Sequence, residues 1–476
     1  MILMGALPLA LHPHPRTVAN IGLGTGLTSH TLLGSPDIER LDTIEIEQKM
    51  IDGARLLSDR VGRVFTDPRS RIHVDDAKSF FSVQGGKYDV IVSEPSNPWV
   101  SGVASLFSDE FYRMVTRHLN DDGLFVQWVQ LYEIDLPLVA SVMKALSPNF
   151  SDYEVYAPNN LDMLIVARKR GAVPPLSFER LAAPGLAAEL ARVDVRGVED
   201  LRVRRIGRKR FLAPFFETFP VPANSDYFPF LEQHAAKTRF LGVNAQAVLG
   251  LSLEALPMAD MLDGTPPGED GPPLSRCAAH ARVLQVEIAK GIREFLLSGR
   301  FDPAYDTITA ETDEATFAFH ATYREAKESA ARVEQLFFSE WPQGDPNRRV
   351  YFFNAAMRTF PYLHPSEAAP IWRRLESGPG GRTLSPVERD YVTLFKAIGE
   401  RDAASMKAAA TRLLETEGDI TPARKRYVLA AALLANAADG TPEQAATLWS
   451  RYRDVVFPTG ELDVVFRALL SHVPSR

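Results

Sequence analysis

The sequence has almost no cysteine, no surplus of basic residues and no long uninterrupted apolar run. Its single cysteine, Cys277, can form no internal disulfide and no cysteine-based metal site, so a reducing, cytoplasmic setting is the simplest interpretation. A count of 53 basic against 60 acidic residues disfavours a dedicated nucleic-acid binder. The longest apolar run, residues 1–11, is interrupted by Pro8 and is too short to cross a bilayer. We interpret it as an amphipathic helix or a lead-in segment that packs on the domain that follows.

The composition is otherwise that of a globular protein, with 45% hydrophobic and 24% charged residues in a chain of 476. Within residues 1–170, β-rich runs alternate with helical patterns at 48–61 and 108–119, which predicts βαβ crossovers and a mostly parallel sheet. The last two runs are close enough to form an antiparallel hairpin, and this layout resembles the Rossmann-like α/β fold of class I S-adenosylmethionine-dependent methyltransferases. The predicted strands are Thr17–Ile21, Arg40–Ile46, Arg71–Asp75, Tyr88–Ser93, Gly123–Val129 and Leu161–Ala167, with another near Tyr153–Tyr156.

Beyond this α/β domain, assigned to residues 1–170, the sequence changes character. Residues 171–256 are mixed and are interpreted as an extension packed on the first domain. Residues 257–273 are rich in Pro, Gly and Asp, which is a linker composition. Residues 274–476 have helical patterns throughout, and stacked hairpins of the tetratricopeptide type or an irregular bundle both fit them.

Polar caps followed by proline mark three helix starts in this last region. Glu388 and Gln444 lie three residues after two of the caps, so each is expected to complete a capping box. The three starts are Ser385-Pro386, Thr421-Pro422 and Thr441-Pro442.

Three features at the ends of the first predicted strands indicate a nucleotide site. Gly22, Gly24 and Gly26 follow the first strand and allow a tight turn that approaches a ligand closely, although a plain strand-to-helix turn remains the alternative. Glu45, at the end of the second strand, is placed to accept hydrogen bonds from both ribose hydroxyls. Asp76, after the third strand, either accepts from an adenine amino group or caps the next helix, and the two roles can coexist.

The end of the fourth strand carries the most informative motif. Glu94 follows the strand directly, and prolines at 95 and 98 stiffen the loop that presents it together with Asn97. Reacting groups in open α/β sheets lie at this edge, so Glu94 is the candidate catalytic residue. Trp99 can wall a pocket or stack on a cation, and Tyr88 can line the same pocket or serve as plain packing.

In these features the sequence resembles the spermidine synthase family of polyamine aminopropyltransferases, over about residues 1–170. The motif from Ser93 to Trp99 looks most like that of a subfamily often fused to a membrane transporter-like region. That region is absent from this sequence. The resemblance therefore implies a possible association of the protein with such a membrane component. The matching pieces, in order, are Leu7, Pro8, Leu9, His12 and Pro13; Gly22, Gly24 and Gly26; Glu45; Asp75, Asp76 and Ala77; and Tyr88–Ile91 leading through Pro98 to Leu106, Phe107, Phe111 and Tyr112.

The resemblance implies a role for each matching residue. The three glycines and Glu45 would hold the methionine and ribose side of decarboxylated S-adenosylmethionine, and Asp76 the adenine. Glu94 stands at the family's catalytic aspartate and Asn97 at a second aspartate that helps to bind a diamine. Gln127, in the matching fifth strand, joins Tyr88 and Trp99 as a substrate-binding candidate.

Departures from the family pattern affect the amine side most. The longer Glu94 shifts its carboxylate by a methylene, and Asn97 removes a negative charge opposite a diammonium substrate. We therefore expect weak turnover of putrescine and a preference for a larger or singly charged amine. The family's small N-terminal β-domain would lie before Met1, which predicts a truncated or misassigned start.

Other functions fit parts of the same pattern. A methyltransferase that uses S-adenosylmethionine itself is one, although no lysine or arginine lies in residues 21–33 to pair with that cofactor's carboxylate. A non-catalytic nucleotide-binding or scaffold protein is another. The expected partners are a small-molecule amine, a second copy of the chain and a protein bound by the helical domain, with no nucleic acid. The ten histidines show no metal-ligand spacing, so no metal is expected.

Overall fold

The structure, a computed structural model, describes residues 1–83, 85–264, 281–298, 360–377, 385–416 and 422–473. The chain divides into two compact units, the first from Met1 to Gly250 and the second beginning at Leu251. Cys277 lies outside the described residues. No helix within the described ranges has both the length and the apolar character of a membrane span.

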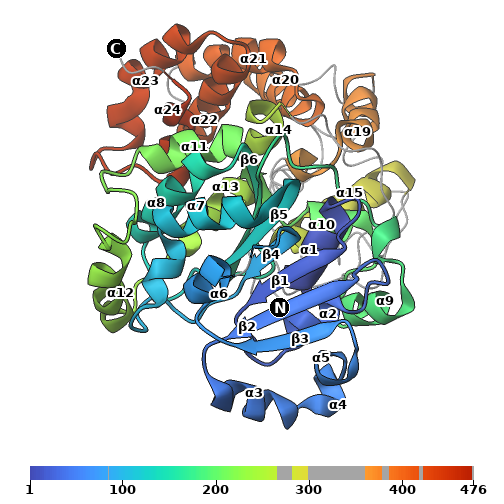
Figure 1. Ribbon diagram of the computed structural model, residues 1–476. Helices are drawn as coiled ribbons and strands as arrows, with labels where there is room; N and C mark the ends of the chain where they lie inside the picture. Colours follow the sequence, from blue (N-terminus) through green and yellow to red (C-terminus); the bar gives the residue numbers. More distant parts are fainter. Residues whose placement is uncertain (84, 265–280, 299–359, 378–384, 417–421, 474–476) are drawn as a thin grey trace. The chain divides into compact units, whose positions relative to one another are not determined.

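An eight-stranded sheet forms the centre of the first unit (Figure 1), in the order β3-β2-β1-β4-β5-β7-β6-β8. Strands β3, β2, β1, β4 and β5 run parallel, and the β5–β7, β7–β6 and β6–β8 pairs are antiparallel. This arrangement confirms the mostly parallel, methyltransferase-like sheet and its terminal hairpin. The strands are β1 (Thr17–Ile21), β2 (Arg40–Glu45), β3 (Ser70–Val74), β4 (Tyr88–Ser93), β5 (Leu119–Gln130), β6 (Asp152–Tyr156), β7 (Asp162–Arg168) and β8 (Arg205–Arg208).

Strand β8 is the element of the sheet that the sequence did not reveal. Two of its four residues are arginines and one is a glycine, whereas a strand is normally recognised by its apolar pattern. Glu154 on the neighbouring β6 is almost fully buried and pairs with Arg208 at 2.7 Å (Nε–Oε1) and with Arg205 at 3.2 Å (NH1–Oε1). The basic stretch therefore closes the sheet by pairing with a buried carboxylate.

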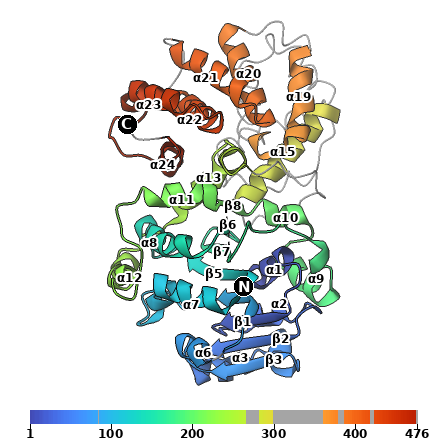
Figure 2. The same cartoon turned by 45° about the horizontal axis from the view of Figure 1, so that its top comes forward.

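Helices cover both faces of this sheet, as Figure 2 shows. On one face α1 packs against α2 and α9, and on the other α8 packs against α7, α11 and α12. The predicted helix over 48–61 is interrupted and forms two helices. The helices of this unit are α1 (Ile2–Leu11), α2 (Leu27–Leu32), α3 (Gln48–Arg55), α4 (Ser58–Val61), α5 (Arg63–Thr66), α6 (Ala77–Val83), α7 (Asp109–His118), α8 (Leu136–Leu146), α9 (Pro184–Ala191), α10 (Val198–Arg202), α11 (Lys209–Glu217) and α12 (Phe230–Leu241), with the 3-10 turn η1 at Val103–Phe107.

Helix α1 is buried along its whole length. It belongs to one apolar cluster that includes Val90 and Val126 of the sheet as well as Leu186 and Leu201 of α9 and α10. A helix enclosed from every direction needs apolar residues all around its circumference. The prediction of a helix that packs on the domain is confirmed, but the helix is not amphipathic.

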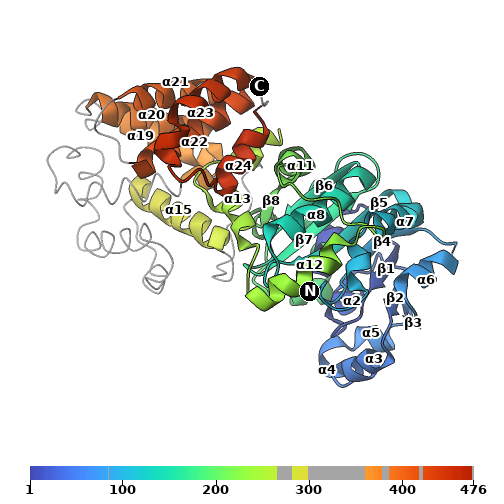
Figure 3. The same cartoon turned by 90° about the vertical axis from the view of Figure 1, so that its left-hand side faces the viewer.

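The described part of the second unit is helical (Figure 3), as the sequence predicted for this end of the chain. Helix α20 packs on α21, α21 on α22, and α22 on α23. The helices are α13 (Gly250–Leu253), α14 (Met258–Leu262), α15 (Ala281–Ser298), α19 (Pro365–Ser377), α20 (Pro386–Glu400), α21 (Ala403–Glu415), α22 (Pro422–Ala438), α23 (Pro442–Val456) and α24 (Val464–Ser471).

The start of the predicted linker is folded rather than open. Met258 and Leu262 of α14 are buried, and the helix packs on α22. Asp260 of the same helix pairs with Arg401 at 3.0 Å (Oδ2–NH2). The linker assignment is therefore wrong for residues 258–262, whose apolar and acidic side chains find partners in the second unit, and residues 265–273 lie outside the described ones.

One of the two predicted capping boxes forms and the other does not. Ser385 and Glu388 form the full box at the start of α20. At the start of α23 the box of Thr441 and Gln444 does not form; the Thr441 hydroxyl instead donates to Oδ1 of the buried Asn436 at 2.9 Å. Thr421 lies outside the described residues, although α22 does begin at Pro422.

We expect the replacement Leu7→Ala in α1 to lower the free energy of unfolding of the first unit by about 2–5 kcal/mol, the usual cost of a cavity in a packed core. Leu7 is 1% exposed, whereas Leu56, at 88% exposed, provides a matched control that should cost less than about 0.5 kcal/mol. Urea unfolding monitored by circular dichroism measures both. Equal effects of the two variants would contradict the burial of α1.

Candidate nucleotide and amine site

The site lies at the edge of the sheet where β1, β2 and β4 end. These strands are parallel neighbours, so their carboxyl ends meet at one edge. Backbone hydrogen bonds continue past the strands: Gly22 N donates to Ile44 O at 2.8 Å, and Glu94 N donates to Ile21 O at 2.9 Å. The structure thus brings the glycine turn, Glu45 and Glu94 together, as the sequence predicted.

The glycine turn needs glycine for two separate reasons. Gly22, Gly24 and Gly26 have φ values of 87°, 51° and 85°, in the left-handed region that side chains disfavour. In addition, a Cβ at Gly22 would overlap the carbonyl oxygen of Glu94, whereas a Cβ at Gly24 would lie 3.7 Å from Glu94 Oε1. The turn therefore packs directly on the residue that follows β4.

Glu45 is held in place by the backbone around it. Its Oε2 accepts from Leu23 N at 2.8 Å, and its Oε1 accepts from Glu47 N at 3.0 Å. The side chain is buried, and each carboxylate oxygen keeps a second lone pair. A fixed carboxylate beside a glycine turn fits a ribose with two hydroxyls.

Asp76 caps a helix, as one of its two predicted roles requires. Its Oδ1 accepts from Ser79 N at 2.9 Å in the first turn of α6. The other carboxylate oxygen, Oδ2, accepts no hydrogen bond from the described part of the chain, so it is available to a ligand. The adenine role stays a prediction.

Glu94 faces the glycine turn and the start of α2. The Thr28 hydroxyl donates to Glu94 Oε2 in a short hydrogen bond. Burial raises the pKa of Glu94 to about 7, although the bond from Thr28 acts in the opposite direction. A carboxyl group with a pKa near neutrality can both accept and release a proton under ordinary conditions.

The loop after Glu94 is fixed by residues from the end of β5 and from α12. Asn97 Nδ2 donates to the Tyr132 hydroxyl at 3.1 Å, and the Tyr132 ring lies edge-on to Trp99 at 6.4 Å. The guanidinium of Arg239 lies 5.1 Å from the centre of the Trp99 ring and 3.7 Å from Glu133 Oε2, which places an internal cation on this tryptophan. Asn97 and Trp99 thus lie in the loop that follows Glu94, and the cation on Trp99 is the protein's own Arg239.

Two of the predicted substrate-binding residues have other partners. Tyr88 begins β4, whereas Glu94 follows its last residue, and the buried Tyr88 hydroxyl donates to Asp42 at 3.0 Å. The structure therefore does not bring Tyr88 to the site, and packing explains it. Gln127 is near the edge but fully buried; its amide accepts from Tyr112 at 2.6 Å and donates to Leu106 O at 2.9 Å, which holds the loop that follows the site.

Sequence reasoning missed Thr28 and Arg239 as residues of the site. Thr28 follows the glycine turn by two positions, and nothing in its local sequence distinguishes it from other helical threonines. Arg239 lies more than a hundred residues from Trp99 along the chain. Only the packing of α12 against α8 and η1 brings it close.

One group of side chains in the described chain has a spacing that could suit a metal ion, namely His12, Asp89 and Asp122. His12 Nδ1, however, accepts a hydrogen bond from His14 N at 3.1 Å, and desolvation lowers the pKa of this histidine. The neutral ring therefore carries its proton on Nε2, the atom that faces the carboxylates, and offers no lone pair to a metal. This group is consistent with a structural role.

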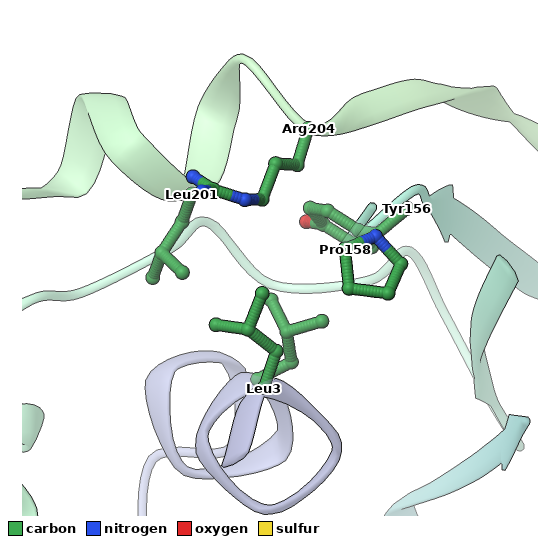
Figure 4. A pocket seen from close by; sticks show the side chains of 6 residues that line it. Leu3, Tyr156, Pro158, Leu201 and Arg204 are labelled. Carbon is green, nitrogen blue, oxygen red and sulfur yellow. The ribbon is translucent and has the colours of Figure 1, made fainter. Parts of the chain in front are cut away.

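A narrow gap lies between α1 and β6 (Figure 4). It is lined by Leu3, Leu7, Tyr156, Pro158, Leu201 and Arg204 and has no room for a water molecule. It therefore offers no space to a ligand.

Comparisons with known proteins agree with this geometry. Residues 2–159 match the family model of the spermine/spermidine synthase domain. The chain is similar to the polyamine aminopropyltransferase of Caldicellulosiruptor bescii, with 30% identity over 154 residues that cover 32% of this chain and 55% of that protein. It is also similar to the enzyme of Nitrosomonas europaea, with 29% identity over 220 residues that cover 44% of this chain and 65% of that protein.

Among solved structures, spermidine synthase from Thermotoga maritima aligns with 24% identity and a TM-score of 0.34, over 38% of this chain and 62% of that one. These matches concern residues 2–159 and make this part of the chain similar to the spermidine synthase family. The chain spans a little over half the length of the first of these curated relatives.

We expect Glu45→Ala to weaken the binding of methylthioadenosine by about 10- to 100-fold, which corresponds to the loss of a charge-assisted hydrogen bond of about 1.5–3 kcal/mol. Isothermal titration calorimetry measures the affinity. Glu47→Ala is the matched control, because Glu47 caps α3 through Lys49 N and should change stability rather than affinity. An unchanged affinity in a folded Glu45→Ala protein would refute this role.

Proposed function

We propose that the first unit transfers an aminopropyl group from decarboxylated S-adenosylmethionine to an amine. The observation that carries the proposal is Glu94, a carboxyl group with a pKa raised to about 7 that faces the glycine turn at the end of β4. The family of residues 2–159 supports it. In the proposed complex, the three glycines and Glu45 hold the adenosyl group and Asp76 contacts the adenine.

Glu94 has two tasks in this reaction. A sulfonium carbon is already activated toward displacement, so the protein must orient the amine in line with the departing sulfur and exclude water. Most amines arrive protonated. The Glu94 carboxylate binds the ammonium and takes its proton, which frees the lone pair for attack.

The co-substrate is the decarboxylated form in this proposal, because no lysine or arginine lies in residues 21–33 to pair with the carboxylate of S-adenosylmethionine. Product analysis distinguishes the candidates. Release of methylthioadenosine indicates aminopropyl transfer, and S-adenosylhomocysteine indicates methyl transfer. If the folded protein releases neither product, both transfer reactions are refuted and a binding or scaffold role remains.

The remaining expectations are part of the proposal as well. They comprise a homodimer, a protein partner for the helical second unit, a cytoplasmic location and the lack of a metal requirement. Sedimentation of the full chain tests the first, and activity retained after treatment with a chelator tests the last.

We expect Glu94→Gln to abolish turnover while the affinity for methylthioadenosine changes less than about threefold, because the glutamine keeps the shape of the side chain but cannot take a proton. Single-turnover product analysis combined with calorimetry measures both quantities. An active Glu94→Gln protein would show that another group is the base.

The pH dependence of kcat/KM should report the same group. Since the pKa of Glu94 is raised to about 7, the carboxylate form is lost as the pH falls below neutrality, and kcat/KM should then decrease by about tenfold per pH unit. Thr28→Val removes the donor that favours the ionised form, so the midpoint should move to higher pH. A midpoint that stays in place in this variant would mean that Glu94 does not control the profile.

A further inference from the structure

A short segment of the second unit, residues 251–263, packs against the longer helices of that unit. It comprises most of α13, the whole of α14 and the stretch between them, and we call it the docked segment. Helices of four or five residues have little stability of their own, so their conformation depends on what they pack against. The apolar residues of the segment are buried, namely Leu251, Ala255, Leu256, Met258 and Leu262.

The surface that holds the docked segment combines residues of three elements. It consists of Tyr362 in the 3-10 turn η7 (Phe360–Tyr362), Arg401 at the end of α20, and Arg426 and Tyr427 in α22, and we call it the docking face. Turn η7 packs on α20, helix α14 packs on α22, and an aromatic ring of α20 lies 5.8 Å from the Tyr427 ring. The four residues therefore belong to one surface.

Two tyrosines of the docking face bind the main chain of the segment. The Tyr362 hydroxyl donates to Leu253 O, and the Tyr427 hydroxyl donates to Ala255 O at 2.6 Å. Carbonyl groups at the end of a helix lack an intrahelical partner, so they need donors from outside the helix. Hydrogen bonds to the main chain hold a peptide whatever side chains it carries, and peptide-binding proteins commonly use them.

Two arginines of the docking face bind the acidic side chains of the segment. Arg401 NH2 lies 3.0 Å from Asp260 Oδ2, and Arg426 NH2 lies 3.1 Å from Glu254 Oε2. The two arginine side chains are 12% and 29% exposed, so both ion pairs are partly shielded from solvent and are stronger than pairs on an open surface. The docked segment is thus recognised by two acids six positions apart, in addition to its apolar residues.

Arg401 has a disfavoured backbone conformation that its side chain explains. It ends α20 with a φ of 59°, in the left-handed region where helices usually place glycine. Its guanidinium donates to Pro361 O at 3.2 Å and to Leu363 O at 3.3 Å, as well as to Asp260. A residue kept in such a conformation indicates a function for that residue. Here the side chain joins the docked segment to both η7 and α20.

We propose that the docking face is a peptide-binding site, that the docked segment occupies it in cis, and that a partner protein of the second unit competes for it. The partner presents a segment of the same chemistry, with two acidic residues six positions apart and apolar residues between and after them. This inference is independent of the transfer reaction, because it concerns residues of the second unit alone. A segment tethered beside its own site has a high effective concentration, so an outside peptide binds weakly until the cis contact is weakened.

The test uses the full chain and a fluorescein-labelled peptide with the sequence of residues 250–264, and fluorescence anisotropy measures the binding. In the variant Asp260→Lys the chain's own segment loses its pair with Arg401, so the peptide should bind this variant at least about tenfold more tightly than the wild-type chain. A peptide that itself carries Asp260→Lys should bind the variant about 10- to 100-fold more weakly than the wild-type peptide does, as for a lost charge-assisted hydrogen bond. Asp454→Lys is the matched control, because this acid of α23 is 86% exposed, and it should bind the peptide as the wild-type chain does.

A second measurement detects displacement in the wild-type chain and needs no variant. Hydrogen exchange followed by mass spectrometry compares residues 251–263 with α21, which packs between α20 and α22. An excess of the same peptide, isotope-labelled so that its fragments are distinguishable, should speed exchange in the chain's own segment and leave α21 unchanged. A displaced segment loses the hydrogen bonds and the burial that protect it.

These measurements separate a bound peptide from a fixed part of the helical unit. Selective binding to Asp260→Lys, or faster exchange of the docked segment in the wild-type chain, supports the proposal. If the peptide binds neither chain and changes no exchange rate, or if a scrambled peptide binds equally well, the proposal is overturned. If Asp260→Lys does not fold, the exchange measurement alone decides.

Discussion

The contact between the glycine turn and the backbone after β4 is the constraint on which the site depends. Gly22 lies so close to the Glu94 carbonyl that no side chain fits between them. That approach fixes the direction in which Glu94 leaves the sheet, and the bond from Thr28 then orients the carboxyl group. Gly22 thus determines where the Glu94 carboxyl group, whose pKa is raised to about 7, stands relative to the glycine turn.

Charge at this edge of the sheet is distributed over several strands. Glu45 accepts hydrogen bonds from two backbone amides, Glu94 from the Thr28 hydroxyl, and Asp162 from the indole of Trp128 and the side-chain amide of Asn159. Asp162, at the start of β7, adds to the rise in the pKa of Glu94, after the larger effect of burial. Under the proposed function, this acidic edge favours a protonated amine, and the charge of Arg239 is paired with Glu133.

The parts of this structure that could be predicted from the sequence are those governed by local patterns. Apolar runs located β1 and β4, and the ends of parallel strands placed Gly22, Glu45 and Glu94 together, because strand order brings such ends to one edge. The amphipathic character expected for α1 was wrong, since a helix covered from all sides loses its polar face. Asp162 and Arg239 could not be found, because cross-strand register and the packing of α12 decide their positions rather than any nearby residue.

The two outer strands of the sheet limit how the first unit can associate with other chains. β3 and β8 form its edges, and both are short and carry basic side chains, with Arg71 and His73 on one and Arg205 and Arg208 on the other. β8 also has an irregular register against β6. Short, charged and irregular edges discourage a further strand from joining the ladder. Copies of this protein that associate would accordingly do so through helical faces, and the sheet should resist growth into fibrillar aggregates even when the protein is concentrated.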